Sequence, residues 1–273
     1  MHTRSLLILA VLVLIPQLSI AGESAEWCDQ QWDRLSAGQG GGSGQDYNKL
    51  LAEWQKLEAK CKGTGLYEAR LATVHVLLGQ YAKARDVLDP ILRNDKLPGH
   101  YRAMMEMVRL NADSREAHAR TEPDRKQLEI IEKRAARLIE QHPDYSPFYL
   151  FLGNLRLELG DYRGAIGPLE KMSQFEDGNR WDVYRNLTIA YANAGDYKAA
   201  LRSADRTYAL NRTVSSHEEF MYACAIAYAA TGSIDAAKDT LTLILNKKPQ
   251  LKNDSRFQQT VQKAKQLSGD KLK

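Results

Sequence analysis

The sequence predicts an all-α protein that folds as a right-handed α-solenoid of helix–turn–helix repeats. Three observations lead to this prediction. A similar phrase recurs around Gly160, Gly195 and Gly232, which are 35 and 37 residues apart, and periods near 34 residues are typical of stacked helical hairpins. The 273-residue chain is rich in Ala, Leu, Lys, Arg, Glu and Gln, which favour helices. No segment shows the sustained alternation of apolar and polar residues that marks a strand.

Each copy of the phrase places the same kinds of side chain at the same positions. A glycine ends the first helix of each hairpin, because only glycine adopts the left-handed conformation cheaply. Small residues before it let the two helices approach closely, and large residues fill the space between neighbouring hairpins. The three copies read Tyr149, Leu152, Gly153, Arg156, Gly160, Ala165; then Tyr184, Leu187, Thr188, Tyr191, Gly195, Ala200; then Met221, Cys224, Ala225, Tyr228, Gly232, Ala237.

This pattern resembles the tetratricopeptide repeat (TPR) family over about residues 65–250, most closely between 147 and 250. An earlier copy surrounds Gly79 and contains Glu68, Leu71, Ala72, His75 and Ala84. The resemblance implies an array of helical hairpins in which the first helix of each hairpin lines a concave groove. It also implies that the groove binds a protein or peptide.

Residues 1–21 are predicted to be a signal peptide that lies outside the fold. Arg4 supplies a basic start, an apolar run extends from Leu6 to Ile15, and Ser19-Ile20-Ala21 provides the small residues that a signal peptidase needs. We expect cleavage after Ala21 and export to a bacterial periplasm, without stable membrane insertion of the mature chain. The alternative is an uncleaved membrane anchor, for which the apolar run is short.

Residues 22–63 are predicted to form an N-terminal helical hairpin. One helix spans about 26–35, the Gly-rich segment 38–44 is its loop, and a second helix capped by Asp46 runs to about residue 60. In an antiparallel hairpin the start of one helix meets the end of the other, which places Cys28 beside Cys61. An oxidising compartment would join them in a disulfide. The alternative is a pair of free thiols.

The solenoid is predicted to span residues 64–250, with repeats at about 65–98, 99–144, 146–179, 181–214 and 218–250. The second repeat is degenerate, because it is longer and lacks the turn glycine. It also interleaves many Arg and Glu residues. We interpret them as i, i+4 pairs on a solvated hairpin, and the alternative is a protruding contact for a partner.

Residues 251–273 are predicted to form a C-terminal capping helix and tail. Phe257, Val261 and Ala264 have the spacing to cover the last repeat, while Gln258, Gln259, Lys263 and Lys265 are expected to face water. Solenoids need such a polar-backed cap, because the last repeat otherwise exposes its apolar face.

The groove that the family resemblance implies assigns a set of partner-binding residues to the first helices of the later repeats. Asparagine suits this role because its amide both donates and accepts hydrogen bonds, as a peptide backbone does. Arg185 and Asn186 are the strongest candidates, and Tyr222 also reads as a core residue. The predicted partner-binding residues are Leu150, Asn154, Arg185, Asn186, Ile189, Asn193 and Tyr222.

The family's carboxylate clamp, which holds peptide C-termini, is incomplete here because its Lys partners are absent. Asn154, Arg185 and Asn186 alone resemble it. We therefore expect a helix or an extended segment in the groove rather than a chain terminus.

Catalysis, a metal and a cofactor are not expected. No two of the six histidines have metal-ligand spacing, and neither a phosphate-binding loop nor a Gly-x-Ser-x-Gly elbow occurs. Cys224 occupies an inward-facing repeat position and reads as a small buried hydrophobe. The net charge of +4 is too small to indicate nucleic-acid binding.

The predicted function is therefore that of a periplasmic TPR adaptor or scaffold, which binds a partner segment within an envelope or secretion assembly. The alternative is a holdase-like periplasmic chaperone for exported proteins, which a broadly apolar groove would favour. Self-association stays open, as do the partner and the pathway.

Overall fold

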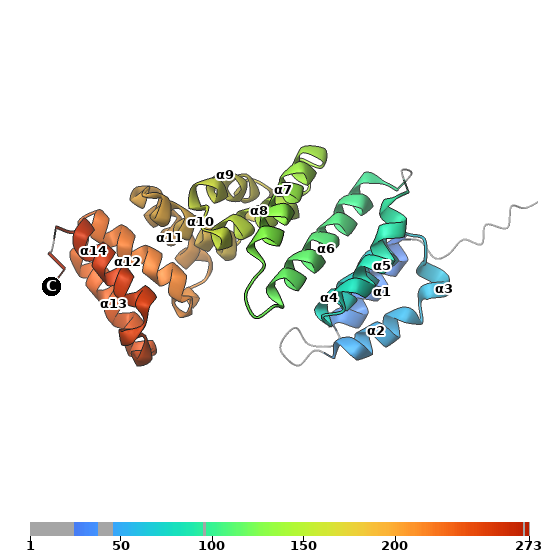
Figure 1. Cartoon of the computed structure of the whole chain (residues 1–273), viewed down its shortest axis with the longest axis horizontal. Coiled ribbons are helices and arrows are strands. Elements are labelled where there is room, and N and C mark those ends of the chain that lie inside the picture. Colours follow the sequence, from blue (N-terminus) through green and yellow to red (C-terminus); the bar gives the residue numbers. More distant parts are fainter. Residues whose placement is uncertain (1–24, 38–45, 95–96, 270, 273) are drawn as a thin grey trace, which may run out of the picture.

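The computed structural model describes residues 25–37, 46–94, 97–269 and 271–272, and every regular element in these ranges is helical. The helices stack along one direction into an elongated array (Figure 1). They are α1 (Ala25–Ala37), α2 (Tyr47–Gln55), α3 (Glu58–Cys61), α4 (Leu66–Leu77), α5 (Tyr81–Leu92), α6 (Gly99–His118), α7 (Arg125–Gln141), α8 (Ser146–Leu159), α9 (Tyr162–Ser173), α10 (Trp181–Ala194), α11 (Tyr197–Leu210), α12 (Glu218–Ala230), α13 (Ile234–Lys247) and α14 (Ser255–Leu267). Short 3-10 helices η1 (Glu176–Gly178), η2 (Val214–Ser216) and η3 (Pro249–Asn253) lie between them.

Consecutive helices from α4 to α13 pair into five hairpins, and each hairpin packs on the next, which confirms the predicted all-α solenoid. The turn glycines behave as the pattern requires. Gly79, Gly160, Gly195 and Gly232 have φ angles of 71°, 81°, 94° and 85°. A side chain at such a position strains the backbone, so glycine is the residue that ends the first helix without cost.

The aspartate after two of these glycines starts the second helix of the hairpin. Asp161 accepts a hydrogen bond from the backbone N–H of Gly164, and Asp196 accepts one from that of Ala199. Each carboxylate thus satisfies a backbone donor that the helix start leaves unpaired. The Gly-Asp pair therefore encodes the whole turn, since one residue ends a helix and the next begins another.

The small residue of the third hairpin is needed for close packing. A Cβ atom added at Gly153 would lie 2.6 Å from Cγ and Cδ2 of Leu169, which is fully buried on α9. The corresponding residue before the next turn glycine is Thr188, and there the residue nine positions after the glycine is Ala204 rather than leucine. A larger side chain on one helix is thus matched by a smaller one on the other.

We expect Gly153→Ala to lower the free energy of unfolding by about 1–3 kcal/mol, because the added methyl group overpacks a full core. Urea denaturation measures this change. The matched control is Gly99→Ala at the exposed start of α6, where an added Cβ meets nothing within 4 Å. That variant should be neutral or more stable by about 0.4–1 kcal/mol. Equal effects of the two substitutions would contradict the packing argument.

The degenerate repeat forms a long hairpin of α6 and α7 within the stack, between α4–α5 and α8–α9. Its charged side chains form ion pairs between helices in addition to the predicted i, i+4 pairs. Asp113 of α6 lies 3.4 Å from Arg85 of α5, 3.7 Å from Arg109 of α6 and 3.1 Å from Arg134 of α7. Three helices are therefore tied to one half-buried carboxylate. The predicted i, i+4 pairing is confirmed for Arg109 with Asp113, and pairs between helices are added to it.

The N-terminal hairpin docks on the first repeat. Cys28 and Cys61 are both fully buried and form the predicted disulfide, with their Cα atoms 5.9 Å apart. The ring of Trp54 lies 5.5 Å from that of Tyr67 on α4, and the indole Nε1 donates a hydrogen bond to the Tyr67 carbonyl at 3.1 Å. The second predicted helix is broken after Gln55, and the short α3 carries Cys61.

At the other end, α14 covers the last hairpin. Asp254 caps the helix by accepting a hydrogen bond from the Phe257 N–H at 3.0 Å. Phe257 and Ala264 are buried, and Val261 packs against the same cluster. Because α14 packs mainly on α12, it continues the row that the first helix of each hairpin forms along the array.

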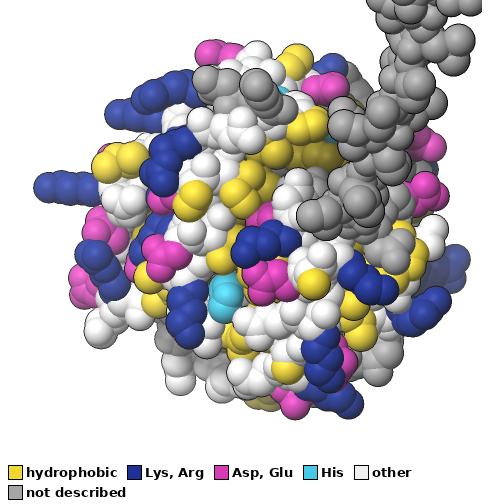
Figure 2. Space-filling view, turned by 90° about the vertical axis from the view of Figure 1, so that its right-hand side faces the viewer, with side chains coloured by type: hydrophobic (Ala, Val, Ile, Leu, Met, Phe, Trp, Pro, Cys, Tyr) yellow, Lys and Arg dark blue, Asp and Glu magenta, His cyan; other side chains and the backbone are white. Residues whose placement is uncertain are grey.

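Two predicted segments lie outside the described residues, namely the signal peptide 1–21 and the Gly-rich loop 38–44. No helix in the described part of the chain combines the length and apolar character needed to cross a bilayer. Figure 2 views the end of the array that carries α1–α3, where Lys and Arg side chains are interspersed with Asp and Glu. The basic charge is therefore not gathered into one patch on this face.

A candidate binding groove

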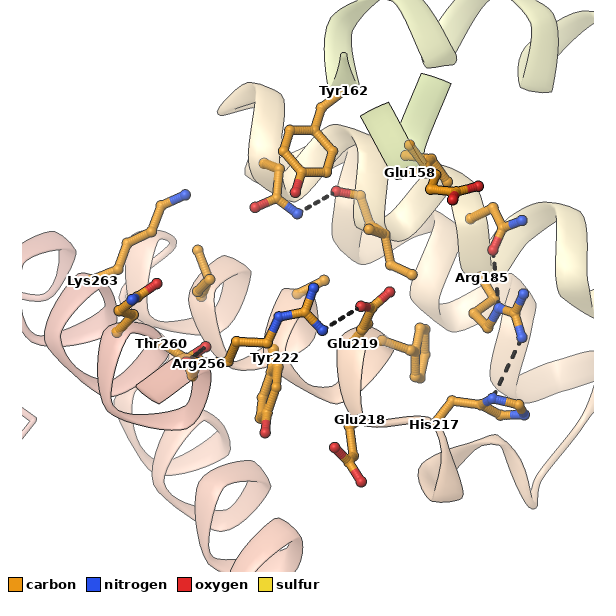
Figure 3. A pocket seen from close by; sticks show the side chains of 18 of the residues that line it. Glu158, Tyr162, Arg185, His217, Glu218, Glu219, Tyr222, Arg256, Thr260 and Lys263 are labelled. Atoms are coloured by element: carbon orange, nitrogen blue, oxygen red, sulfur yellow. Dashed lines mark hydrogen bonds and ion pairs between the residues drawn. The ribbon is translucent and has the colours of Figure 1, made fainter. Parts of the chain in front are cut away.

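A groove of about 940 Å³ lies along the first helices of the C-terminal repeats. Its lining comes from α8, α10, α12 and α14, with Tyr162 from the start of α9 and His217 from the residue before α12 (Figure 3). These helices occupy equivalent positions in successive hairpins, so the stacking itself places their exposed faces side by side. The groove is therefore a product of the repeat, as the pattern predicts.

The structure brings together six of the seven predicted partner-binding residues. Asn154, Arg185, Asn186, Ile189, Asn193 and Tyr222 line this groove. Leu150 does not, because it packs against the buried cluster that contains Tyr149 and Leu169. One helical turn separates the partly buried Leu150 from Asn154. The binding role of the six residues stays a prediction.

Arg185 is held in a defined position by three neighbours. Its guanidinium carbon lies 5.1 Å from the centre of the Trp181 ring, a cation–π distance. Its Nε donates to Oδ1 of Asn186 at 3.0 Å, and a terminal nitrogen lies 3.4 Å from Nδ1 of His217. Burial lowers the pKa of Arg185 below its ordinary value, although nearby carboxylates oppose this shift. The groove thus contains a cation that is partly removed from water.

The charge of Arg185 affects the protonation of His217. Burial lowers the pKa of His217 and the charge of Arg185 lowers it further, so the imidazole is neutral at pH 7. Since the guanidinium can only donate, Nδ1 of His217 accepts and its proton lies on Nε2. His217 therefore adds no positive charge beside Arg185 at neutral pH.

Asn186 and Asn154 are joined to Arg185 in a chain of hydrogen bonds, whereas Asn193 bonds the backbone of its own helix. Nδ2 of Asn186 donates to Oδ1 of Asn154 at 2.6 Å, and Nδ2 of Asn193 donates to the carbonyl of Ile189 at 2.9 Å. Asn186 is buried while Asn154 is exposed. Asn186 therefore orients its neighbours, and the exposed Asn154 amide keeps two donors that this chain does not use.

Sequence reasoning missed one wall of the groove. The cap helix α14 supplies Arg256, Gln259, Thr260 and Lys263, although Gln259 and Lys263 were expected to face bulk water. The spacing of Phe257 and Ala264 predicted which face of this helix is buried, but the neighbours of its other faces depend on how α14 packs on α12. This wall could have been predicted from one property of repeat arrays: the cap helix occupies the position that the first helix of a further repeat would take.

The three carboxylates of the groove already have basic partners. Glu158 of α8 contacts His118 of α6, and Glu218 contacts Lys248 at the end of α13. Glu219 lies 2.8 Å from Arg256 of α14. These contacts join different helices, so they hold the walls of the groove in place as well as neutralising their charges.

Tyr222 is more a core residue than a contact. Its side chain is 8% exposed, and its ring lies 6.3 Å from that of Phe257. Burial raises the pKa of Tyr222, and its hydroxyl has no hydrogen-bond partner among the described residues. The residue packs α12 against α14 and reaches the groove with one edge.

The other candidate chemical groups are structural. Burial raises the pKa of Cys224 to about 12, so its thiol is protonated at neutral pH. His75 is buried, and its Nδ1 lies 2.8 Å from Oε1 of Gln80. No group of three or more His, Cys, Asp or Glu side chains in the described residues is arranged to hold a metal ion. The expectation that the protein is not an enzyme stays a prediction.

His118 links the degenerate repeat to the groove in a protonation-dependent way. Its Nδ1 faces the Ser114 carbonyl and its Nε2 faces Glu158. Because both oxygens only accept, both ring nitrogens donate, which is the protonated form. Burial lowers the pKa of His118, but the hydrogen bonds to Glu158 and Ser114 outweigh this effect and raise it above 6.5.

We expect His118→Gln to lower the free energy of unfolding at acidic pH but not at basic pH. A raised folded-state pKa gives stabilisation that is complete below the unfolded-state pKa and is lost as the pH rises through the folded-state pKa. The loss should stay below about 1 kcal/mol, because the pair is partly exposed. Urea denaturation of wild type and variant between about pH 6 and pH 9 measures it. His100→Gln, at an exposed position, is the control, and a difference that grows with pH would refute the assignment.

Comparison with known proteins agrees with this fold. Residues 68–90 match the family model described as tetratricopeptide repeat. A search of curated proteins found no match. Among solved structures, the one described as "MamA MSR-1 C2" is 18% identical, with a TM-score of 0.51, and the match covers 67% of this chain and 98% of that one. The one described as "MamA AMB-1 P212121" is also 18% identical, with a TM-score of 0.49 and coverage of 68% and 92%. At this identity the first likeness bears on the fold alone.

Proposed function

Because this chain is a tetratricopeptide-repeat protein, we propose that it is an exported adaptor that binds a segment of a partner protein in the groove of α8, α10, α12 and α14. One observation carries the proposal. Six residues that the repeat pattern assigns to partner binding lie together in one groove of about 940 Å³. Proteins with this repeat act as interaction scaffolds, and the groove is the surface that such a scaffold uses.

The chemistry of the lining suits a peptide segment. Leu157, Ile189 and Ile226 supply apolar surface, while Asn154 and Asn193 supply amide groups beside it. An extended segment gains affinity from backbone hydrogen bonds and specificity from side-chain pockets. A helix instead would place one apolar face on the isoleucines.

Export is supported by the N-terminal sequence and by the disulfide. Residues 1–21 have the three regions of a signal peptide, and buried Cys28 and Cys61 are paired in a way that an oxidising compartment maintains. We propose a periplasmic location on these grounds. Edman sequencing of the protein recovered from the cell envelope should begin at Gly22. An intact N-terminus would favour a retained anchor instead.

The mixed lining favours an adaptor over a general chaperone. A holdase needs a broad apolar surface that accepts many clients, whereas this groove carries the ionisable side chains of Glu158, Arg185, Glu218, Glu219, Arg256 and Lys263. Charges at defined positions discriminate between partners, because an unmatched buried charge is costly.

The test is an affinity capture from envelope extract with three baits. Wild type is compared with Gln259→Trp, which puts a bulky ring into the groove from an exposed position on α14, and with Gln258→Trp. Gln258 is the neighbouring exposed residue and is not part of the lining. Neither substitution removes a buried contact, so both variants should fold. Their thermal unfolding provides the check.

One protein captured at fixed stoichiometry by wild type and Gln258→Trp, and lost with Gln259→Trp, is the expected result. Capture of that protein by all three baits would contradict the proposal, because the binding surface would lie elsewhere. A broad set of unrelated exported proteins would favour the chaperone function. The same experiment therefore separates the two functions.

A further inference from the structure

The groove contains more unpaired positive than negative charge. Among the described residues, no carboxylate lies within ion-pair distance of Arg185, although its side chain is half-buried. The acidic groups that act on it from nearby are held by other arginines. Asp182 lies 2.7 Å from Arg180, and Glu219 lies 2.8 Å from Arg256.

The remaining carboxylates of the groove are also engaged. Glu158 and Glu218 contact His118 and Lys248, respectively. Lys263 of α14 lines the groove without an ion pair in the described structure, and it lies across the groove from Arg185 in Figure 3. The ion pairs within the protein therefore account for every groove carboxylate and leave two cations on opposite sides.

The surroundings of Arg185 show that its position is built rather than incidental. Trp181 packs against the guanidinium, Asn186 accepts from Nε, and Asn186 is itself fixed by Asn154. Burial lowers the pKa of Arg185, so the free protein holds this cation at a desolvation cost. A carboxylate that enters the groove would offset that cost, and a planar guanidinium binds a carboxylate with two parallel hydrogen bonds.

We propose that the segment bound in this groove is acidic, with one side-chain carboxylate on the Arg185 guanidinium and a second beside Lys263. This inference rests on the proposed function, because it specifies the chemistry of the partner for the same groove. It concerns carboxylates within a segment, not the carboxylate of a chain terminus. The Asn154 amide beside Arg185 is positioned to bond the backbone of that segment.

The experiment selects binders from a displayed library of random peptides on the purified protein, so that the partner need not be known. The selection is done in parallel on wild type and on Gln259→Trp. A consensus peptide is then synthesised with a fluorescent label, together with a copy in which its Glu or Asp residues are replaced by the corresponding amides. Fluorescence anisotropy measures the Kd of both peptides for each protein variant.

The protein variants separate a specific pair from a general charge effect. Arg185→Gln and Lys263→Gln remove the two groove cations. Arg202→Gln on α11 and Lys265→Gln on α14 change the net charge equally at exposed positions outside the groove. Arg185→Lys keeps the charge but not the bidentate geometry. Circular dichroism establishes that each variant is folded.

If the proposal is right, the selected peptides are enriched in Glu and Asp, and Arg185→Gln weakens binding by about tenfold or more. Arg202→Gln and Lys265→Gln leave the Kd unchanged. The amide peptide binds wild type as weakly as the acidic peptide binds Arg185→Gln, and combining both changes adds little, because each removes the same pair. The peptide substitution keeps the test decisive even if Arg185→Gln does not fold.

Neutral or basic peptides whose binding is blocked by Gln259→Trp would overturn this inference while leaving the proposed function intact. Peptides unaffected by Gln259→Trp, or a selection without binders, would overturn both. An equal change of Kd for Arg185→Gln and Arg202→Gln would show that binding depends on net charge in general. That result would also refute a specific pair between Arg185 and a carboxylate of the peptide.

Discussion

Replacement of Cys28 and Cys61 by alanine is expected to lower the free energy of unfolding by about 3–4 kcal/mol. The bond closes a loop with a sequence separation of 33, and in the chain-entropy model a loop of this length gives a stabilisation of that size. Alanine is the better replacement than serine, because both sulfur atoms are fully buried and a buried hydroxyl would add its own cost. Guanidinium denaturation of the oxidised proteins measures the change.

Reductant provides the control for this result. Added dithiothreitol should destabilise the wild type and leave the double variant unaffected. Cys224→Ala, at a buried cysteine outside the disulfide, should keep the wild-type sensitivity to reductant. A wild type whose stability does not respond to complete reduction would show that the bond contributes little.

Phe220→Ala is expected to lower the stability of the C-terminal repeats by about 3–5 kcal/mol, the usual cost of truncating a buried phenylalanine. Phe220 is fully buried at the start of α12, and its ring lies 5.2 Å from that of Tyr208 on α11 in an edge-to-face arrangement. The residue also lines the groove. The variant should therefore lose both packing between the last two repeats and the shape of the binding surface.

Hydrogen exchange measures this effect where it occurs. In a stacked array each repeat contacts only its neighbours, so the loss should be greatest in α11–α14 and small in α4–α7. Ile130→Ala is the control, because Ile130 is 60% exposed on α7 and its truncation should change stability by less than about 0.5 kcal/mol. Uniform loss of protection along the whole chain after Phe220→Ala would contradict the nearest-neighbour picture.

The two variants act at opposite ends of the molecule, and together they test whether the ends are independent. The disulfide joins α1 to α3 beside the first repeat, while Phe220 lies in the last hairpin. For sites this far apart with no shared contacts, the two losses should add. A triple substitution whose cost differs clearly from the sum would show that the two ends interact or do not unfold in the same transition.

Prediction from sequence succeeded where the determining forces are local. A glycine with positive φ ends a helix wherever the repeat places it, so Gly79, Gly160, Gly195 and Gly232 could be identified without knowledge of the rest of the chain. The pairing of Cys28 with Cys61 followed from the antiparallel direction of two neighbouring helices. Most of the groove residues could also be predicted, because the first helix of each hairpin presents the same face to the groove.

The failures lie where contacts connect distant segments. Leu150 was assigned to the groove but is not part of its lining, and it packs, partly buried, against the cluster that contains Tyr149 and Leu169. Arg134 of the degenerate repeat was assigned to a partner on its own helix, whereas it reaches Asp113 on α6. The wall formed by α14 was missed for the same reason.

The sequence by itself thus determined the solenoid, the position of its turns and the disulfide. Each depends on backbone conformation or on chain direction over one or two neighbouring helices. Only the tertiary structure decided that Glu158, Glu218 and Glu219 are neutralised by residues from other helices while Arg185 is not. A charge pattern along the chain counts residues of each sign, but the free energy of an ion depends on its burial and on the nearest opposite charge. Those quantities exist only once the helices have stacked.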